Sequence, residues 1–175
     1  IRPSRGLGDV YKRQAGDRAF CAGADLKHRA RERDADAAQR AYWEKLVGET
    51  KSLIERWHFP KPIIARVNGF ALGGGLEVAV ATDFRMIAED GRMGVPEIQL
   101  GLIPGGGGTQ RLARLAGVTM AKDMVYSGRH VGAEEALANK IVSSIHDPDE
   151  LQDTAIAKAA QYATGPAALR MAKRA

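Results

Sequence analysis

Residues 61–77 read KPIIARVNGFALGGGLE, which predicts a strand, a turn and the start of a helix in immediate succession. Pro62–Val67 is a short apolar run typical of a buried strand, and Asn68–Gly69 predicts a turn after it. Leu76–Thr82 has the composition of a buried helix, and Phe84–Ala88 predicts the next strand. Strands that alternate with helices in this way predict an α/β fold.

The same alternation extends toward both ends of the chain. Further helices are expected over Asp36–Trp57, Gly105–Leu115, Met120–Tyr126, Ala133–Asn139, Pro148–Ala163 and Pro166–Lys173, and a further strand over Ile141–Ile145. No internal repeat or low-complexity linker divides the sequence, so one domain is the simplest interpretation.

The composition is that of a soluble globular domain. The chain has 175 residues, of which 45% are hydrophobic and 27% charged, and this length can bury a core of useful size. No apolar run reaches the length of a bilayer span, and Ile1–Gln14 lacks the apolar block of a signal peptide. The single cysteine, Cys21, favours a reducing compartment. The net charge of +5 fits either a polyanionic partner or a few surplus surface charges.

Glycine is the most unevenly distributed residue, because eleven of the 20 glycines lie between Gly69 and Gly108. Such a concentration indicates either a site built from main chain or several tight turns. Gly105–Gly108 is followed by Thr-Gln, so it is not a phosphate-binding P-loop. The four histidines are scattered, and no metal site is expected. Cys21 has no histidine that the sequence can pair with it, so a small residue filling a turn is the simpler interpretation than a nucleophile.

Three stretches together indicate a catalytic site: RAFCAGADLK at 18–27, NGFALGGGLE at 68–77 and VPEIQLGLIPGGGGTQR at 95–111. Two of them are turns rich in glycine and alanine that precede or open a helix, where free N–H groups can accept developing negative charge. Glu77 and Glu97 lie just after such backbone. An oxyanion site with two carboxylates is what proton transfer beside a carbonyl requires. The alternative is that the glycines are caps and turns and the glutamates are solvated.

Taken in order, these motifs resemble the crotonase superfamily and, within it, the enoyl-CoA hydratases, over about residues 15–175. GADLK with HRA, IPGGGGTQRL and the final GPAALRMAK resemble the methylglutaconyl-CoA hydratase branch. The resemblance implies an α/β, crotonase-like spiral of ββα units (the ClpP/crotonase fold), here incomplete at both termini. It also implies an acyl-CoA substrate, and assembly of the full-length parent into a homotrimer or a hexamer.

The resemblance further implies hydration of a 2-enoyl-CoA to a 3-hydroxyacyl-CoA. Backbone N–H groups of Ala24 and Gly74 would hold the thioester carbonyl, and Glu77 and Glu97 would hold the water. Glu77 would help to deprotonate the water, and Glu97 would deliver a proton to the α carbon. Two carboxyl groups that share a water repel each other, which should raise the pKa of one of them.

Further substrate contacts are implied at Ala22, Asp25, Leu26, Lys27, Gly73, Leu100, Gly105 and Gly106. Coenzyme A is part of the substrate, and no metal or redox cofactor is implied. The expected location is the cytoplasm, or the mitochondrial matrix in a eukaryote.

Three alternatives remain open at this point. One is another crotonase-type reaction such as double-bond isomerisation. Another is RNA binding through the basic residues between Lys27 and Arg33, as in some hydratase relatives, although Glu32 and the absence of aromatic platforms favour a solvated helix entry. The last is a noncatalytic remnant.

The two ends depart from the family pattern. Gly6–Gln14 has no continuous apolar face and makes a poor buried strand, so residues 1–14 are expected to be a non-native or disordered leader before a partial core domain at 15–175. Residues 1–14 also carry most of the basic excess, since 22 basic and 20 acidic residues remain without them. We expect the 175-residue chain itself to fold poorly or to be inactive.

Overall fold

The computed structural model describes residues 11–12, 18–23, 61–166 and 168–173. The strands are β1 Tyr11–Lys12, β2 Ala19–Cys21, β3 Ile64–Val67, β4 Phe70–Leu72, β5 Phe84–Ala88, β6 Arg92–Gly94, β7 His130–Gly132 and β8 Ser144–His146. The helices are α3 Gly74–Val80, the 3₁₀ helix η1 Pro96–Leu100, α4 Gly108–Ala116, α5 Val118–Ser127, α6 Ala133–Ala138, α7 Leu151–Ala163 and α8 Ala168–Ala172. The helix expected over Asp36–Trp57 lies outside the described residues.

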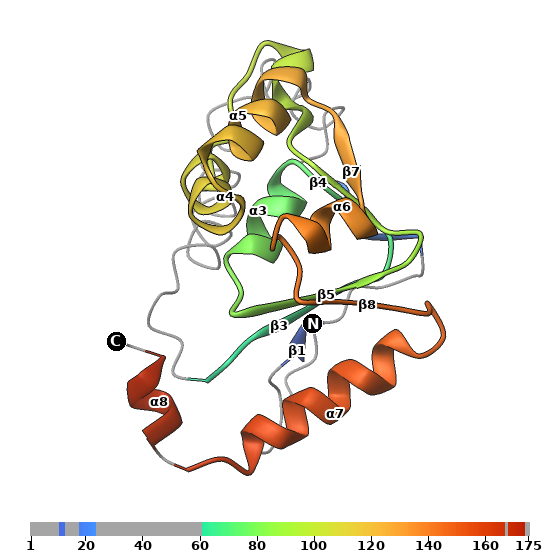
Figure 1. Ribbon diagram of the computed structural model, residues 1–175, viewed down its shortest axis with the longest axis vertical. Coiled ribbons are helices and arrows are strands. Elements are labelled where there is room, and N and C mark those ends of the chain that lie inside the picture. Colours follow the sequence, from blue (N-terminus) through green and yellow to red (C-terminus); the bar gives the residue numbers. More distant parts are fainter. Residues whose placement is uncertain (1–10, 13–17, 24–60, 167, 174–175) are drawn as a thin grey trace, which may run out of the picture.

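The described strands form two four-stranded sheets. Strands β1 to β6 go alternately to one sheet and to the other, β7 joins β6 in the second sheet, and β8 returns to the first. The first sheet has the order β1-β3-β5-β8 and is parallel throughout. The second has the order β2-β4-β6-β7, and only its β6–β7 pair is antiparallel. The chain therefore winds as β3-β4-α3 and then β5-β6 followed by helices, with α3 above the first sheet (Figure 1). This is the α/β spiral of ββα units that the family resemblance implies.

The central strands β3 and β5 of the first sheet are buried, mostly by apolar side chains, with Arg66 and Arg85 as the buried charged exceptions. Along β3, Ile64 packs with Met86 and with α7, whereas Ala65 and Val67 face the core around α3. The alternation follows from the two-residue period of a strand, which sends neighbouring side chains to opposite faces. Central strands covered in this way give α3 a rigid base.

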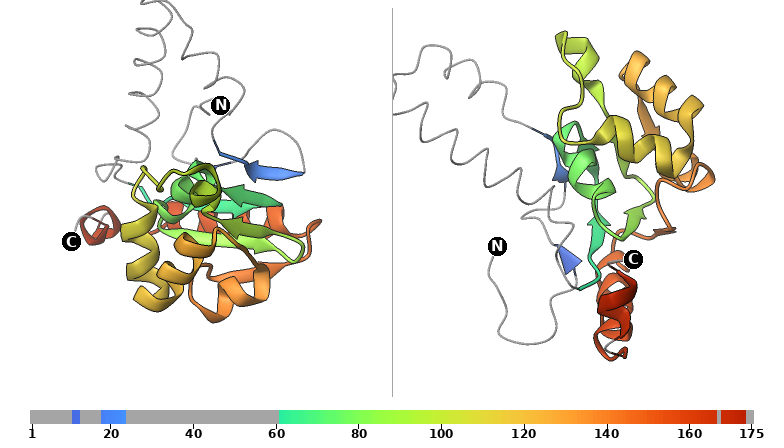
Figure 2. Two further views of the ribbon diagram at one scale, coloured as in Figure 1. Left: turned by 90° about the horizontal axis from the view of Figure 1, so that it is seen from above. Right: turned by 90° about the vertical axis from the view of Figure 1, so that its left-hand side faces the viewer.

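The two ends of the molecule are occupied by different helices. Helices α7 and α8 lie at the opposite end from η1 and α5 (Figures 1 and 2). Helix α8 is tied to the sheet by Lys173, whose ammonium group lies 2.7 Å from Asp83 Oδ2 and donates to the carbonyl of Lys61 at 2.6 Å. No helix in the described residues has the length and apolarity needed to cross a membrane.

Several sequence expectations need correction in detail. The helix expected from Gly105 begins at Gly108, and the strand expected over Ile141–Ile145 is shifted to Ser144–His146. The three-residue strands β4, β6 and β7 and the helix η1 were not expected at all. Elements this short are too brief to show a periodic pattern. Gly6–Gln14 is expected to make a poor buried strand, yet Tyr11 and Lys12 within it form β1 and pair in parallel with Ile64 and Ala65.

Candidate active site

The two glycine-rich turns that the sequence suggested lie against each other. Strand β2 pairs in parallel with β4, so that Cys21 is in register with Ala71. A Cβ placed on Gly23, just beyond β2, would lie 2.9 Å from the carbonyl oxygen of Leu72 and 3.6 Å from the nitrogen of Gly74. The positive φ of Gly23, 92°, also favours glycine. The turn after β2 and the turn before α3 therefore form one continuous backbone surface.

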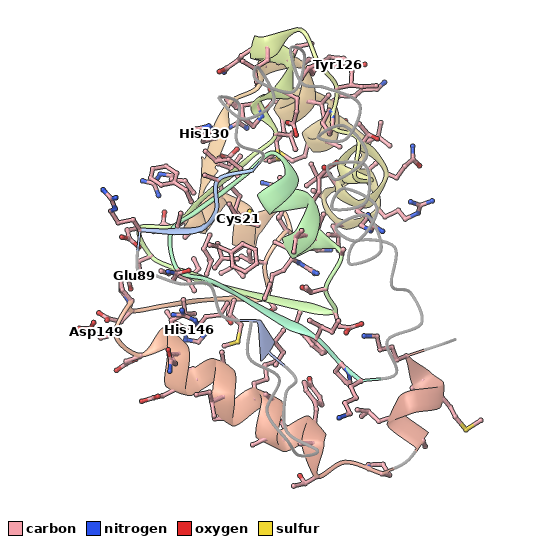
Figure 3. The ribbon with its side chains drawn as sticks, turned by 180° about the vertical axis from the view of Figure 1, so that it is seen from behind. Cys21, Glu89, Tyr126, His130, His146 and Asp149 are labelled. Atoms are coloured by element: carbon pink, nitrogen blue, oxygen red, sulfur yellow. The ribbon has the colours of Figure 1, made fainter. Side chains whose placement is uncertain are left out.

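Gly75 shows how closely these two turns approach. A Cβ on Gly75 would overlap the backbone carbonyl of Cys21, whereas a Cβ on its neighbour Gly74 would meet no described atom within 4 Å. Cys21 lies beside α3 in the side-chain view (Figure 3). The contact requires glycine at Gly75, and the space at Gly74 leaves the first turn of α3 accessible.

This contact gives a stability prediction. Gly75→Ala should lower the free energy of unfolding by about 1–3 kcal/mol, because the backbone of β2 must move to admit the methyl group. Gly74→Ala is the matched control and should be neutral or stabilising by up to about 1 kcal/mol, since alanine has the higher helix propensity. Urea unfolding followed by circular dichroism measures both. Equal stability of the two variants would show that β2 does not pack against α3 as described.

Glu77 is a buried carboxylate on α3, with 4% of its surface exposed. Its Oε1 accepts hydrogen bonds from the backbone N–H groups of Gly106 at 2.6 Å and Gly108 at 2.9 Å. Gly105–Gly108, hereafter the glycine loop, can present both N–H groups because Gly107 has φ 94° and because Gly108 is the first residue of α4. One carboxylate oxygen is thus fixed by main chain.

Glu97, in the first turn of η1, lies against the turn before α3. A Cβ on Gly73 would be 3.1 Å from Glu97 Oε1, and Gly73 itself has φ 55°. The other oxygen, Oε2, is buried and accepts no hydrogen bond from the described residues. The surroundings of the two glutamates are therefore unequal, since Glu77 is held by two donors and Glu97 keeps a buried oxygen without one.

The surroundings of Glu97 raise the pKa of its carboxyl group. Burial is the main cause that raises its pKa, a backbone hydrogen bond partly offsets this, and the nearby Glu77 carboxylate raises the pKa further. The expectation that one pKa is raised is confirmed, but repulsion between the two carboxyl groups is the smaller cause. Desolvation dominates because the carboxyl group leaves water and Oε2 gains no donor from the part of the chain that the structure describes.

The raised pKa of Glu97 predicts a pH dependence of stability. A carboxyl group with a higher pKa in the folded state holds its proton more tightly when folded. Its contribution to stability is complete below the ordinary glutamate pKa of about 4.3 and is lost as the pH rises through the folded-state pKa. Glu97→Gln is neutral at every pH, so it should raise the free energy of unfolding near pH 7 and change it little near pH 4. Urea unfolding at both pH values, with the exposed Glu134→Gln as control, measures this; a gain no larger at pH 7 than at pH 4 contradicts it.

The other residues nominated from the sequence are only partly brought together. Gly73 and Gly106 contact the two glutamates, as described above. Ala22 is exposed beside the first turn, and Leu100 ends η1 with 52% of its surface exposed. A Cβ on Gly105 would meet no described atom within 4 Å. The remaining nominated residues, Ala24, Asp25, Leu26 and Lys27, lie outside the described residues.

Two residues of the site were not recognised from the sequence. Gly108 is the second donor to Glu77, and Arg111 donates from Nη1 to the carbonyl of Gly106 at 2.7 Å. The run of four glycines before a helix was a signal for free N–H groups, but it does not say which of them meet a carboxylate.

Within the described residues, no group of three or more His, Cys, Asp or Glu side chains is arranged to hold a metal ion. His130 and His146 lie well apart on β7 and β8 (Figure 3).

Comparison with known proteins gives consistent matches. The family described as "Enoyl-CoA hydratase/isomerase" matches residues 14–175. The mitochondrial methylglutaconyl-CoA hydratase of Mus musculus is 41% identical over 160 residues, which cover 88% of this chain and 49% of that protein. The short-chain-enoyl-CoA hydratase of Clostridium acetobutylicum is 38% identical over 162 residues, 92% of this chain and 60% of that protein.

Solved structures agree with these sequence matches. The crystal structure of an enoyl-CoA hydratase from Bacillus anthracis superposes with a TM-score of 0.80 at 42% identity, over 91% of this chain and 60% of that one. The chain thus spans about half to three fifths of the length of these relatives. The methylglutaconyl-CoA and short-chain hydratases match at similar identity, so the comparisons do not separate these two branches.

Proposed function

Because the chain belongs to the enoyl-CoA hydratase/isomerase family of the crotonase superfamily, we propose that it supplies the catalytic centre of a hydratase. The reaction is the syn addition of water to a 2-enoyl-CoA thioester, which gives a 3-hydroxyacyl-CoA. The observation that carries the proposal is the pair of unequal glutamates, Glu77 on α3 and Glu97 on η1, which lie close enough for the charge of Glu77 to raise the pKa of Glu97. Hydration needs a group that takes a proton from water and a group that gives one to carbon, and the pair provides both.

Glu77 is the group that activates the water. Its Oε1 is held by Gly106 and Gly108, so the carboxylate has a fixed orientation and can accept a proton from water through its other oxygen. The oxygen of that water bonds to C3 of the substrate as the C2–C3 double bond is lost. Fixing the base in advance removes the entropic cost of aligning it during the reaction.

Glu97 is the group that protonates carbon. Its raised pKa favours the protonated form, which can deliver a proton to C2. Glu77 then holds one extra proton and Glu97 lacks one, and transfer of that proton through the next bound water restores both. The net change is addition of one water.

The thioester oxygen becomes negatively charged during this step and needs hydrogen-bond donors. We assign this role to the N–H groups of Gly74 and Ala24. Two features support the assignment: Gly74 is the first residue of α3, whose early N–H groups have no partner within the helix, and Gly23 abuts the same turn. One such donor is typically worth about 10²–10³ in rate.

The remaining roles follow from family membership and are part of the same proposal. Ala22, Asp25, Leu26, Lys27, Gly73, Leu100, Gly105 and Gly106 would contact the coenzyme A or acyl part of the substrate. Coenzyme A enters as part of the substrate, without a further cofactor. The whole protein would assemble as a trimer or hexamer in the cytoplasm or the mitochondrial matrix.

The test is an assay with crotonyl-CoA, on this chain and on any longer protein that contains it. Hydration removes the ultraviolet absorbance of the conjugated thioester and gives a product heavier by one water in the mass spectrum. A 3-enoyl-CoA substrate serves as the second arm, because isomerisation would create that absorbance without a change in mass. Isomerisation without hydration, or neither reaction in the longer protein, would overturn the proposal.

A further inference from the structure

The glycine loop holds Glu77 through the N–H groups of two peptides. The peptide between these two points its carbonyl to Arg111 instead. The N–H groups of Gly106 and Gly108 both point to Glu77 Oε1. The carbonyl of Gly106, which belongs to the peptide between them, accepts the Arg111 bond at 2.7 Å instead. The loop therefore makes two hydrogen bonds to Glu77 on α3 and one to the side chain of Arg111 on α4.

Arg111 is placed to fix the rotation of that middle peptide. The backbone N–H of Arg111 donates to the carbonyl of Gly107 at 2.9 Å. The backbone and the guanidinium group of Arg111 therefore bind the carbonyls of two consecutive loop residues, Gly107 and Gly106. Glycine peptides rotate more easily than others because they lack a Cβ. A loop of four glycines needs an external contact to hold two N–H groups toward one oxygen, and Arg111 supplies one.

We infer that Arg111 is a positioning residue, which acts through the glycine loop to orient the Glu77 carboxylate. The inference rests on the proposed function only for its kinetic consequence, since the hydrogen bonds themselves do not depend on the substrate. Arg111 is partly buried, and a Cβ on Gly107 would collide with its guanidinium group, so the arginine packs directly on the loop.

Among the described residues, few charged side chains lie on the elements that pack against α3. Strands β2 and β4 and helix α4 pack against α3. Strand β2 contributes Cys21, β4 has no titratable side chain, and α4 contributes Arg111 and Arg114. Glu97 faces the pair from η1. Arg114 is exposed and donates to Gln110 within its own helix, so it provides a matched control for Arg111.

The test compares Arg111→Met, Arg111→Lys and Arg114→Met. In ¹⁵N-labelled protein, the amide protons of Gly106 and Gly108 should move upfield in Arg111→Met, because their bonds to Glu77 lengthen. They should stay near the wild-type positions in Arg114→Met and return part of the way in Arg111→Lys, which keeps a donor. In the hydratase assay, kcat should fall about 10- to 100-fold in Arg111→Met with KM little changed.

The outcomes separate this inference from the proposed function. If the series made in the longer protein does not hydrate crotonyl-CoA but the amide shifts follow this order, the proposed function is wrong and the positioning role stands. If the Gly106 and Gly108 amides of Arg111→Met match those of Arg114→Met, the positioning role is wrong. Should Arg111→Met not fold, a kcat of Arg111→Lys equal to wild type with unmoved amides would equally overturn it.

Discussion

Glu77→Gln should lower kcat for crotonyl-CoA hydration by about 10²–10⁴ while KM stays within a few-fold of wild type. The glutamine carbonyl can still accept the N–H groups of Gly106 and Gly108, so the shape of the site is kept. What is lost is the second carboxylate oxygen, which an NH₂ group replaces and which can then no longer take a proton from water. The whole effect should therefore appear in the chemical step.

The controls for this variant are chosen to separate chemistry from folding. Glu134→Gln, an exposed position on α6, makes the same chemical change outside the site and should leave kcat unchanged. Glu77→Ala should also lose about 1–3 kcal/mol of stability, because it leaves two donors without their acceptor. Steady-state kinetics and urea unfolding measure these effects. A Glu77→Gln protein with normal turnover would refute the role given to Glu77.

Glu97→Gln should lower kcat by a similar factor of about 10²–10⁴, for a different reason. The amide keeps the size of the side chain beside Gly73 but has no proton to give to C2. In D₂O, exchange of the C2 hydrogen of 3-hydroxybutyryl-CoA with solvent should slow by a comparable factor, because the exchange needs the same group. Mass spectrometry of the recovered thioester measures it.

The pH profile gives a further check on Glu97. Since its pKa is raised and the protonated form donates, kcat in the wild type should decline as the pH rises through that pKa. The residual activity of Glu97→Gln should lack this decline, because the amide does not titrate. Unchanged C2 exchange in the variant would assign the proton transfer to another group. We therefore expect Glu97→Gln to be less active than wild type but more stable near pH 7.

Much of the fold could be predicted from local pattern. The apolar run before Asn68 predicted β3, and the glycines after it predicted a helix start, which the structure places at Gly74. Both signals are strong because they depend on neighbouring residues alone. The strands β4, β6 and β7 escaped prediction because three residues carry no period, and their strand geometry comes from pairing with distant partners.

The sequence by itself determined which chemical groups are present: two glutamates, and glycine turns that leave N–H groups free. Tertiary structure alone decided how they meet. It placed Gly23 against Leu72, gave Glu77 the N–H groups of Gly106 and Gly108, and left Glu97 Oε2 buried without a donor among the described residues. The physical reason is that hydrogen bonding and desolvation depend on atoms brought together from distant parts of the chain, and these set the different surroundings of two chemically identical side chains.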